Sequence, residues 1–271
     1  MTAPILQKTL PHFPWMEPPL ARLPGVVPLE GEDWLIADDA FAGQMARRDG
    51  LLAQRPDQVH ALLPGAVPAA QELYHLVLDS LSRRPGYQLR ATDATRPDGV
   101  TVRLDRSQPL KTLGRLVQED FCLMEVPVDQ ATAGEHVLTG AILCFPASWT
   151  LAQKIGRPLT AIHEPVPPYD DAIARRVQRM FDAIRVDQVL CRMNFLSYDD
   201  PELFQPRLEG QRRPRPVHHV YLRAERQCLR RLPVTRAVVF SIHSYVMRVD
   251  DLPLAARQGF LAAMGVETPR S

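Results

Sequence analysis

Two segments in the first third of the chain have the pattern of amphipathic helices. Asp38 and Asp39 precede a run of helix-forming residues that continues to Leu52. In residues 69–83 the apolar positions recur three and four residues apart, at Leu73, Leu76, Val77 and Leu81. This spacing places apolar side chains on one face of a helix, so both segments are predicted to be helical.

The clearest helical pattern follows a proline-rich stretch that ends at Pro168. Asp170 and Asp171 are placed to cap this helix, and its apolar positions are Ile173, Ala174, Val177, Met180, Phe181 and Ile184. Shorter helices are expected on either side of it. Residues 150–156 have capping-box spacing and end in a glycine, residues 157–169 allow at most one turn, and a last helix is expected around residues 253–264.

From about residue 86 the apolar period changes to two, which is the period of a β-strand. The alternating segments are YQLRATD, VTVRLD, RLVQEDFCLMEV, TGAILCF, DQVLCRMNFLSYD, HHVYLRAERQCLRRL and AVVFSIHSYVMRV. Helical segments around such a run of strands predict an α+β protein. We expect an antiparallel sheet with helices on one side and an N-terminal helical extension.

We expect one domain over residues 1–271. Residues 1–85 would form a proline-rich extended arm and helices, residues 86–252 the sheet core, and residues 253–271 the last helix. Two domains with a break near residue 85 are the alternative.

Composition and charge argue against several classes of protein. Hydrophobic residues make up 45% and charged residues 23% of the chain, which is ordinary for a globular protein. A formal net charge of +1 provides no field for binding nucleic acid. No apolar run approaches the roughly 20 residues of a membrane helix, and the N-terminus lacks a signal-peptide pattern, so we expect a cytoplasmic protein.

The motifs of common hydrolases and nucleotide-binding proteins are missing. The sequence contains no GxSxG, no HExxH, no glycine-rich phosphate loop and no GxGxxG after a strand. Cys122, Cys144, Cys191 and Cys228 form no CxxC pair, so they do not match a zinc or iron–sulfur site. We interpret these cysteines as buried free thiols.

His163 has the most unusual context among the eight histidines. It ends the short turn predicted before the prolines, and its apolar and aromatic neighbours are Phe145, Trp149, Leu159, Ile162 and Val166. A histidine on a short helix over a sheet, with apolar walls, suits a haem iron. The alternative is a capping or surface histidine in a proline-rich loop.

His243 is the rival candidate. Strand alternation places it on one face with Val239, Ser241 and Tyr245. A strand histidine among hydroxyl groups is more often a hydrogen-bonded core residue.

Two predicted strands combine charged and apolar residues on one face. Arg192 and Asn194 share a face of one strand, and Arg223 and Glu225 share a face of the next. One explanation is a cross-strand ion pair on a solvated face. The other is the polar end of a ligand pocket, in which arginine binds a carboxylate and glutamate or asparagine orients a small amine.

Several longer stretches together resemble the haem (alpha) subunit of haem-dependent oxidative N-demethylase. They are QEDFCLM, CFPASWTLAQKIGRPLTAIHEPVPPY, CRMNFLSYDD and LRAERQCLRRLP, and the resemblance runs from about Trp15 to Leu252. It implies a PAS-like fold that binds haem b (heme b). It also implies an enzyme that removes a methyl group from dimethylamine as formaldehyde, using O₂ and electrons from a separate NADPH-dependent flavin and [2Fe–2S] reductase.

The resemblance favours His163 as the iron ligand, because it is the histidine in the matching stretch. Candidates for the polar lining are Arg192, Asn194, Arg223, Glu225 and Arg226, some of which would bind the haem propionates. His243 is a candidate distal or propionate contact. Phe195 stands where the resemblance leads us to expect tryptophan, which would alter the shape of the pocket.

Two other functions stay open at this point. A haem-based gas sensor or haem carrier would use the same scaffold without turnover. A haem-free module would keep the fold and bind another small molecule.

Overall fold

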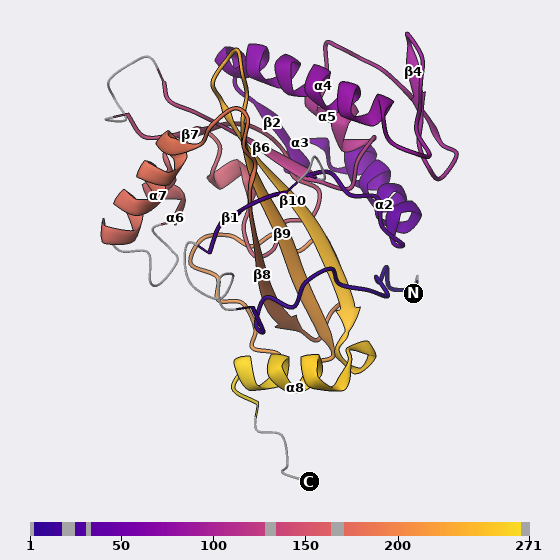
Figure 1. Cartoon of the computed structure of the whole chain (residues 1–271), viewed down its shortest axis with the longest axis vertical. Coiled ribbons are helices and arrows are strands. Elements are labelled where there is room, and N and C mark those ends of the chain that lie inside the picture. The colour runs from indigo at the N-terminus through magenta and orange to yellow at the C-terminus, as the bar shows by residue number, and fades with distance from the viewer. Residues whose placement is uncertain (1–2, 18–24, 31–33, 128–133, 164–170, 267–271) are drawn as a thin grey trace.

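The computed structural model describes residues 3–17, 25–30, 34–127, 134–163 and 171–266, with the backbone alone at residues 163 and 171–174. The predicted α+β class and the antiparallel sheet are both confirmed (Figure 1).

The main sheet has seven strands, and every neighbouring pair in it is antiparallel. In spatial order they are β1 (Val27–Pro28), β8 (Leu190–Tyr198), β9 (Tyr221–Arg231), β10 (Val238–Arg248), β6 (Asp120–Glu125), β7 (Val137–Ile142) and β2 (His60–Leu62). The longest strands, β8, β9 and β10, are consecutive in sequence, as their alternation predicts. The first two segments read as strands instead contribute to a separate three-stranded sheet of β3 (Gln88–Leu89), β4 (Asp93–Thr95) and β5 (Thr101–Arg103).

One face of the main sheet carries Phe121, Arg226 and Val239, and we call it the α2 face. Helices α2 (Phe41–Gln54), α4 (Val67–Ser82) and α5 (Pro109–Gly114) pack their buried apolar residues in one cluster with Phe121 and Val239. Two short helical segments, α3 (Pro56–Val59) and η1 (Pro64–Ala66), connect α2 to α4 around β2. Helix α5 has no counterpart among the predicted helices.

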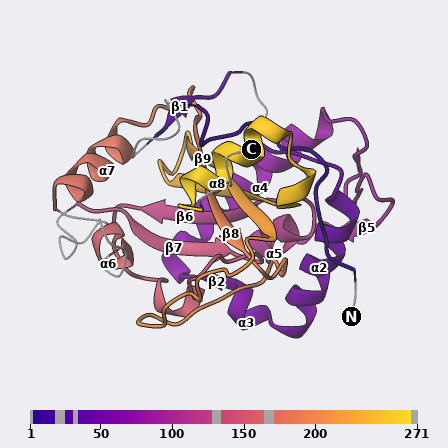
Figure 2. The same cartoon turned by 90° about the horizontal axis from the view of Figure 1, so that it is seen from below.

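The other face carries Cys122, Glu225 and Ile242, and we call it the α6 face. It is covered by η3 (Leu151–Gln153), α6 (Leu159–His163) and α7 (Asp171–Ala183), whose apolar side chains cluster with Cys122 and Ile242. Figures 1 and 2 show α6 and α7 on the side of the sheet away from α2. The expectation that helices lie on one side only is therefore wrong, because both faces of the central strands are apolar enough to require a cover.

Residues 150–156 form only a single 3₁₀ turn rather than a capped helix. The Thr150 hydroxyl donates to the carbonyl of Arg207 at 2.7 Å and makes no capping bond. Gly156 does end the turn, with a φ of +77°, as expected for a C-terminal glycine.

The N-terminal arm and the last helix cover one end of the sheet (Figure 2). Helix α8 (Leu254–Ala263) follows the 3₁₀ turn η4 (Val249–Asp251). The ring of Trp15 lies 5.1 Å from that of Phe195 and 5.3 Å from that of Phe260. Its indole Nε1 donates to the carbonyl of Ala256 at 2.9 Å. These contacts tie the arm to β8 and α8.

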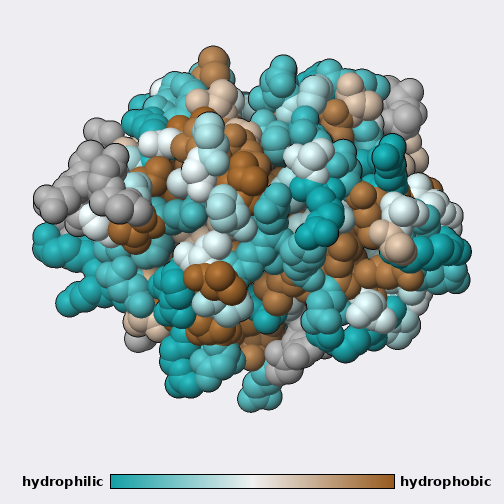
Figure 3. Space-filling view, turned by 90° about the horizontal axis from the view of Figure 1, so that it is seen from above, coloured by the Kyte–Doolittle hydropathy of each residue, from teal (hydrophilic) through white to brown (hydrophobic). Residues whose placement is uncertain are grey.

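Seen from the α4 end, apolar side chains reach the surface in scattered groups between polar ones (Figure 3). Across the described ranges, no helix has both the length and the apolar character needed to cross a membrane.

Candidate functional site

Four predicted site residues lie together on the α6 face. Asn194 of β8 lies directly opposite Glu225 of β9, and Arg192 lies opposite Gln227. Opposite residues of an antiparallel pair project to the same side, as do residues two apart on one strand. Arg192, Asn194, Arg223, Glu225 and Gln227 therefore share this face, and we call them the polar cluster. Strand alternation predicts the grouping within each strand, and the register of β8 with β9 joins the two groups.

The carboxylate of Glu225 is the centre of the polar cluster. Its Oε2 accepts hydrogen bonds from Nδ2 of Asn194 at 3.1 Å and from Nε2 of Gln227 at 3.0 Å. Its Oε1 lies 3.5 Å from Nη2 of Arg223. Because Glu225 is buried and bonded to three donors, its carboxylate has a fixed orientation.

Arg223 joins the polar cluster to two loops. Its Nη1 donates to the carbonyl of Leu203 at 2.9 Å, and its Nη2 donates to the carbonyl of Phe145 at 2.6 Å. The loops also bind each other, because the Ser148 N–H donates to the carbonyl of Gln205 at 3.0 Å. Residues 145–150 and 203–207 thus lie against the same part of the α6 face.

Each of the three long strands changes from polar to apolar within two positions on this face. The polar members are Arg192, Gln227 and Ser244, and the apolar members are Leu190, Leu229 and Ile242. Trp149, Leu159 and Ile162 pack in the same apolar cluster from the η3 and α6 side. An apolar surface that ends in a few charged groups is the usual composition of a small-molecule site.

Several buried polar atoms around the polar cluster have no hydrogen-bond partner within the part of the chain that the structure describes. They are Oγ of Ser148, Nε of Arg192, the hydroxyl of Tyr198, Nε of Arg207 and Nε of Arg223. Three of them project from the α6 face of β8 and β9, and the other two belong to the loops bound to it. An unpaired buried polar group costs about 1–3 kcal/mol. These atoms are therefore available to hydrogen-bond a polar ligand or ordered water.

Arg192 and Arg223 bring two positive charges to the polar cluster, against one negative charge from Glu225. Burial lowers the pKa of Arg192, and the Glu225 carboxylate opposes this effect. The excess of positive charge favours an anionic group beside Arg192.

The family model of the haem-dependent oxidative N-demethylase, alpha subunit-like proteins matches residues 25–264 of this chain. The chain belongs to this family. The match spans α6 and all three long strands, so the polar cluster and its apolar neighbours lie within the matched region. The family name indicates haem dependence and an N-demethylase-like activity, and "alpha subunit-like" implies a partner subunit.

The side chains of the α6 face have the chemical character of a haem site, as the family name requires. A haem is an apolar plate with two carboxylates, and it would match the apolar side chains of Trp149, Leu159 and Ile162 beside the part-buried guanidinium of Arg192. Among the described residues, no three His, Cys, Asp or Glu side chains converge on a possible metal site. Haem iron does not need such a cluster, because one axial side chain can hold it.

His163 is the last residue of α6, and its side chain, like the whole of Val166, lies outside the described residues. Its role as iron ligand therefore stays a prediction. The contacts that hold α6 in place do lie within the described residues. The buried Lys154 donates from Nζ to the carbonyl of Ile162 at 2.6 Å and to Oε1 of Glu209 at 2.6 Å. This lysine fixes the C-terminal end of α6.

The ring of Phe145 lies apart from Trp149, Leu159 and Ile162, which the sequence also predicts as haem contacts. Its ring packs in the α2-face cluster, and the guanidinium carbon of Arg48 lies 5.3 Å from the ring centroid. Only its carbonyl reaches the polar cluster, through Arg223. Strand alternation cannot predict the direction of the Phe145 side chain, because Phe145 lies in a loop after β7.

Arg226 and His243 lie apart from the polar cluster. They lie opposite each other on β9 and β10, on the α2 face. The sheet separates them from Glu225 and α6, so neither can contact a ligand held between α6 and the sheet.

His243 instead belongs to a buried ionic network. Its Nδ1 lies 3.0 Å from Oε1 of Glu119, and its Nε2 lies 3.0 Å from Oδ2 of Asp38. Burial alone would lower the pKa of His243, but the hydrogen bonds to Asp38 and Glu119 raise it to about 9. The imidazolium thereby links β10 to the residue before β6 and to the segment before α2. No local sequence signal points to these partners.

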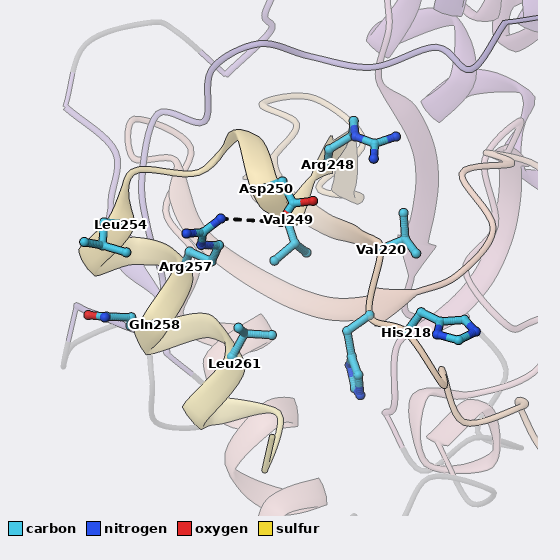
Figure 4. A pocket seen from close by; sticks show the side chains of 10 residues that line it. His218, Val220, Arg248, Val249, Asp250, Leu254, Arg257, Gln258 and Leu261 are labelled. Carbon is cyan, nitrogen blue, oxygen red and sulfur yellow. Dashed lines mark hydrogen bonds and ion pairs between the residues drawn. The ribbon is translucent and has the colours of Figure 1, made fainter. Parts of the chain in front are cut away.

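A cavity of about 430 Å³ lies between α8 and the start of β9 (Figure 4). Its lining residues are His218, His219, Val220, Arg248, Val249, Asp250, Leu254, Arg257, Gln258 and Leu261. Arg257 pairs with Asp250 at 3.4 Å on one wall. The residues predicted for the site are absent from this lining, so we do not connect the cavity with the family's activity.

Proposed function

We propose that this chain is the haem-binding subunit of an enzyme that removes a methyl group from a small secondary amine such as dimethylamine. The observation that carries the proposal is the juxtaposition, on the α6 face, of an apolar cluster and a part-buried Arg192 whose buried Nε has no partner among the described residues. The family to which the chain belongs supplies the reaction class.

The haem, which we propose is haem b, would lie between α6 and the sheet. His163 would be its iron ligand, and its spacing of one helical turn from the buried Leu159 supports this choice. Trp149, Leu159 and Ile162 would contact the porphyrin, and Arg192 would bind a propionate. When bound, the haem would supply the reductive activation of O₂.

Glu225 is our candidate for the residue that positions the amine. Asn194 and Gln227 fix its Oε2, while Oε1 has, among the described residues, only the long contact with Arg223, at 3.5 Å. A carboxylate oxygen has more than one acceptor direction, so Oε1 can accept the amine N–H and orient a methyl group. The apolar cluster beside it would exclude water from the oxidised carbon.

The proposed reaction consumes the amine, one O₂, two electrons and two protons. It yields the demethylated amine, formaldehyde and water, and this sum balances in atoms and charge. The sequence has no GxGxxG motif after a strand and no cysteine cluster for an iron–sulfur centre. We therefore propose that a separate flavin and [2Fe–2S] reductase passes electrons from NADPH, in line with the alpha subunit-like family name.

Haem reconstitution with absorption spectroscopy tests the proposal. The wild-type protein is expected to show a Soret band that shifts on titration with dimethylamine, and to release formaldehyde when supplied with electrons. His163→Ala is expected to lose the wild-type spectrum. A wild-type spectrum in His163→Ala would remove the ligand assignment.

His75 provides a matched control, because its exposed side chain lies in α4 away from the α6 face. His75→Ala is expected to keep the wild-type spectrum. Haem binding without any response to amine would favour the gas sensor or carrier over the demethylase. A wild-type protein without a Soret band would reject the haem proposal as a whole.

A further inference from the structure

Two of the four cysteines lie directly opposite each other in the sheet. Cys191 of β8 pairs in register with Cys228 of β9, and both project to the α2 face, away from the polar cluster. Nothing in the proposed demethylation uses them.

The directions of the backbone hydrogen bonds show whether Cys191 and Cys228 form a hydrogen-bonded or a non-hydrogen-bonded pair. The N–H of Leu29 in the β1 segment donates to the carbonyl of Val189, so odd-numbered residues of β8 direct their backbone groups toward β1. The N–H of Val249 donates to the carbonyl of Val220, and the N–H of Leu232 donates to the carbonyl of Ala237. Even-numbered residues of β9 therefore direct their backbone groups toward β10.

It follows that Cys191 and Cys228 form a non-hydrogen-bonded pair across β8 and β9. In such pairs the Cα atoms lie about 4.5 Å apart and the side chains approach most closely. A disulfide requires Cα atoms about 4.4–6.8 Å apart. The strands therefore hold the two cysteines at a separation that a disulfide can bridge without moving the backbone.

The surroundings of the two thiols differ. Cys228 is 1% exposed, whereas Cys191 is only partly buried. The hydrogen bond from the Cys228 thiol lowers the pKa of Cys191, burial opposes this effect, and the neighbouring Arg226 guanidinium adds to it. The hydrogen bond to Cys191 and burial raise the pKa of Cys228. One thiol is thus the better nucleophile, and the other is placed to react with its oxidised form.

We propose that Cys191 and Cys228 are a peroxide-reactive thiol pair that closes a reversible disulfide across β8 and β9. The Cys191 thiolate attacks one oxygen of hydrogen peroxide, the O–O bond breaks, and the departing hydroxide takes up a proton. Cys191 is then a sulfenic acid. The Cys228 thiol attacks that sulfur, the S–O bond breaks, and hydroxide leaves with the thiol proton as water. Two thiols lose two electrons in total, and one peroxide becomes two waters.

The other two cysteines provide internal controls. Burial raises the pKa of Cys122, and burial raises the pKa of Cys144 to about 12. Cys122 lies opposite Ala141 on β7 and opposite Phe240 on β10, so neither neighbouring strand offers it a thiol. Oxidation should therefore select one pair out of the four cysteines.

The test treats the full-length protein with hydrogen peroxide, blocks remaining thiols with iodoacetamide, and maps peptides by mass spectrometry. The expected product is a peptide pair linked through Cys191 and Cys228, lighter by two hydrogen atoms and separated by dithiothreitol. Peroxide-treated protein that contains both cysteines unlinked, or sulfinic acid at Cys191 without any bridge, would overturn the proposal. This readout uses wild-type protein and needs neither haem nor turnover.

A rate measurement separates reactivity from simple exposure. Before oxidation, Cys191 is expected to react with iodoacetamide about ten-fold faster than Cys122 or Cys144 near neutral pH. In Cys228→Ser the sulfenic acid at Cys191 should persist and be trapped by dimedone, whereas Cys122→Ser should leave the bridge intact. A bridge in Cys228→Ser to any other cysteine, or equal alkylation rates for all four, would contradict the assignment.

Discussion

Asn194 donates a hydrogen bond from Nδ2 to Oε2 of Glu225 at 3.1 Å, across two neighbouring strands. The bond joins residues that are 31 positions apart and fixes a buried carboxylate beside an apolar surface. Gln227 donates to the same oxygen, whereas the other oxygen, which we propose binds the amine, has a longer contact of 3.5 Å with Arg223.

Glu225→Gln is expected to separate haem binding from amine binding. The amide is nearly isosteric but has no charge and only one acceptor oxygen, so the response to dimethylamine should weaken by about ten-fold or more. The Soret band should stay close to wild type. Absorption titration measures both. Asp187→Asn, which removes an exposed carboxylate paired with Arg185, is the control and should change neither.

Arg192→Met is expected to move stability and haem affinity in opposite directions. Since Nε of Arg192 has no partner among the described residues, an apolar side chain of similar length should leave the haem-free protein as stable or more stable. Loss of a propionate contact should weaken haem binding by about 1–3 kcal/mol. Thermal melts of the haem-free protein and haem titrations measure the two effects. Unchanged haem affinity would show that Arg192 does not bind the cofactor.

His243 is expected to stay protonated well above neutral pH. Its pKa is raised from 6.5 to about 9, so its contribution to stability is complete below about pH 6.5 and is lost as the pH rises through 9. The shift corresponds to roughly 3 kcal/mol. Asp38 has a lowered pKa, so its contribution is lost at the acid end, as the pH falls below 3.8.

Nitrogen NMR of the imidazole reports the ionisation of His243 directly. A midpoint near 6.5 would contradict the proposed charge state. Urea unfolding of wild type and His243→Gln across the same pH range checks the linkage, because the variant should lack the decline between about pH 6.5 and 9.

Arg48→Met is expected to destabilise the fold strongly. Arg48 is fully buried, its Nη1 lies 2.7 Å from Oδ1 of Asp120, and its other nitrogens donate to backbone carbonyls. Removing it leaves the Asp120 carboxylate buried without its partner, at a cost of about 3–5 kcal/mol. Its neighbour Arg47 has a part-exposed pair with Glu202, so Arg47→Met should change stability by less than about 1 kcal/mol. Urea denaturation compares the two variants.

Two glycines are expected to respond oppositely to alanine. A Cβ at Gly140 would lie 2.7 Å from Cδ1 of Leu62, so Gly140→Ala should lower the free energy of unfolding by about 1–3 kcal/mol. Gly50 lies within α2, and a Cβ there would meet nothing within 4 Å. Gly50→Ala should raise stability by roughly 0.5–1 kcal/mol. A stabilising Gly140→Ala would contradict the packing described for Gly140, and a destabilising Gly50→Ala would contradict the open space described at Gly50.

The sequence predicts the strands and the polar cluster because both follow from a period of two. Arg192, Asn194, Arg223 and Glu225 share a face by alternation, and the register then places them side by side. Alternation does not say which face of a doubly covered sheet a ligand occupies. Both faces of β9 and β10 carry charged or polar residues. From the sequence alone, His243 and Glu225 are therefore equally good candidates for contacting a ligand, and only the positions of the helices distinguish them.

Long-range partners account for the other failures. Glu119 and Asp38 are 124 and 205 residues from His243, and no local pattern connects them. The Thr150 hydroxyl donates to the carbonyl of Arg207, 57 residues away, and so does not form the capping box that its spacing from Gln153 predicts.

The order of strands in the main sheet constrains how the chain can be assembled. β6 and β7 pair as neighbours in the sequence, but the other edge of β6 is completed only by β10, the last strand, through pairs such as Phe121 with Ser241. During synthesis on the ribosome that edge stays open until nearly the whole chain has emerged. Forming such distant pairs late makes folding slow and leaves an apolar strand accessible to other chains. Truncation just before β10 should therefore give an aggregating product rather than a smaller folded protein.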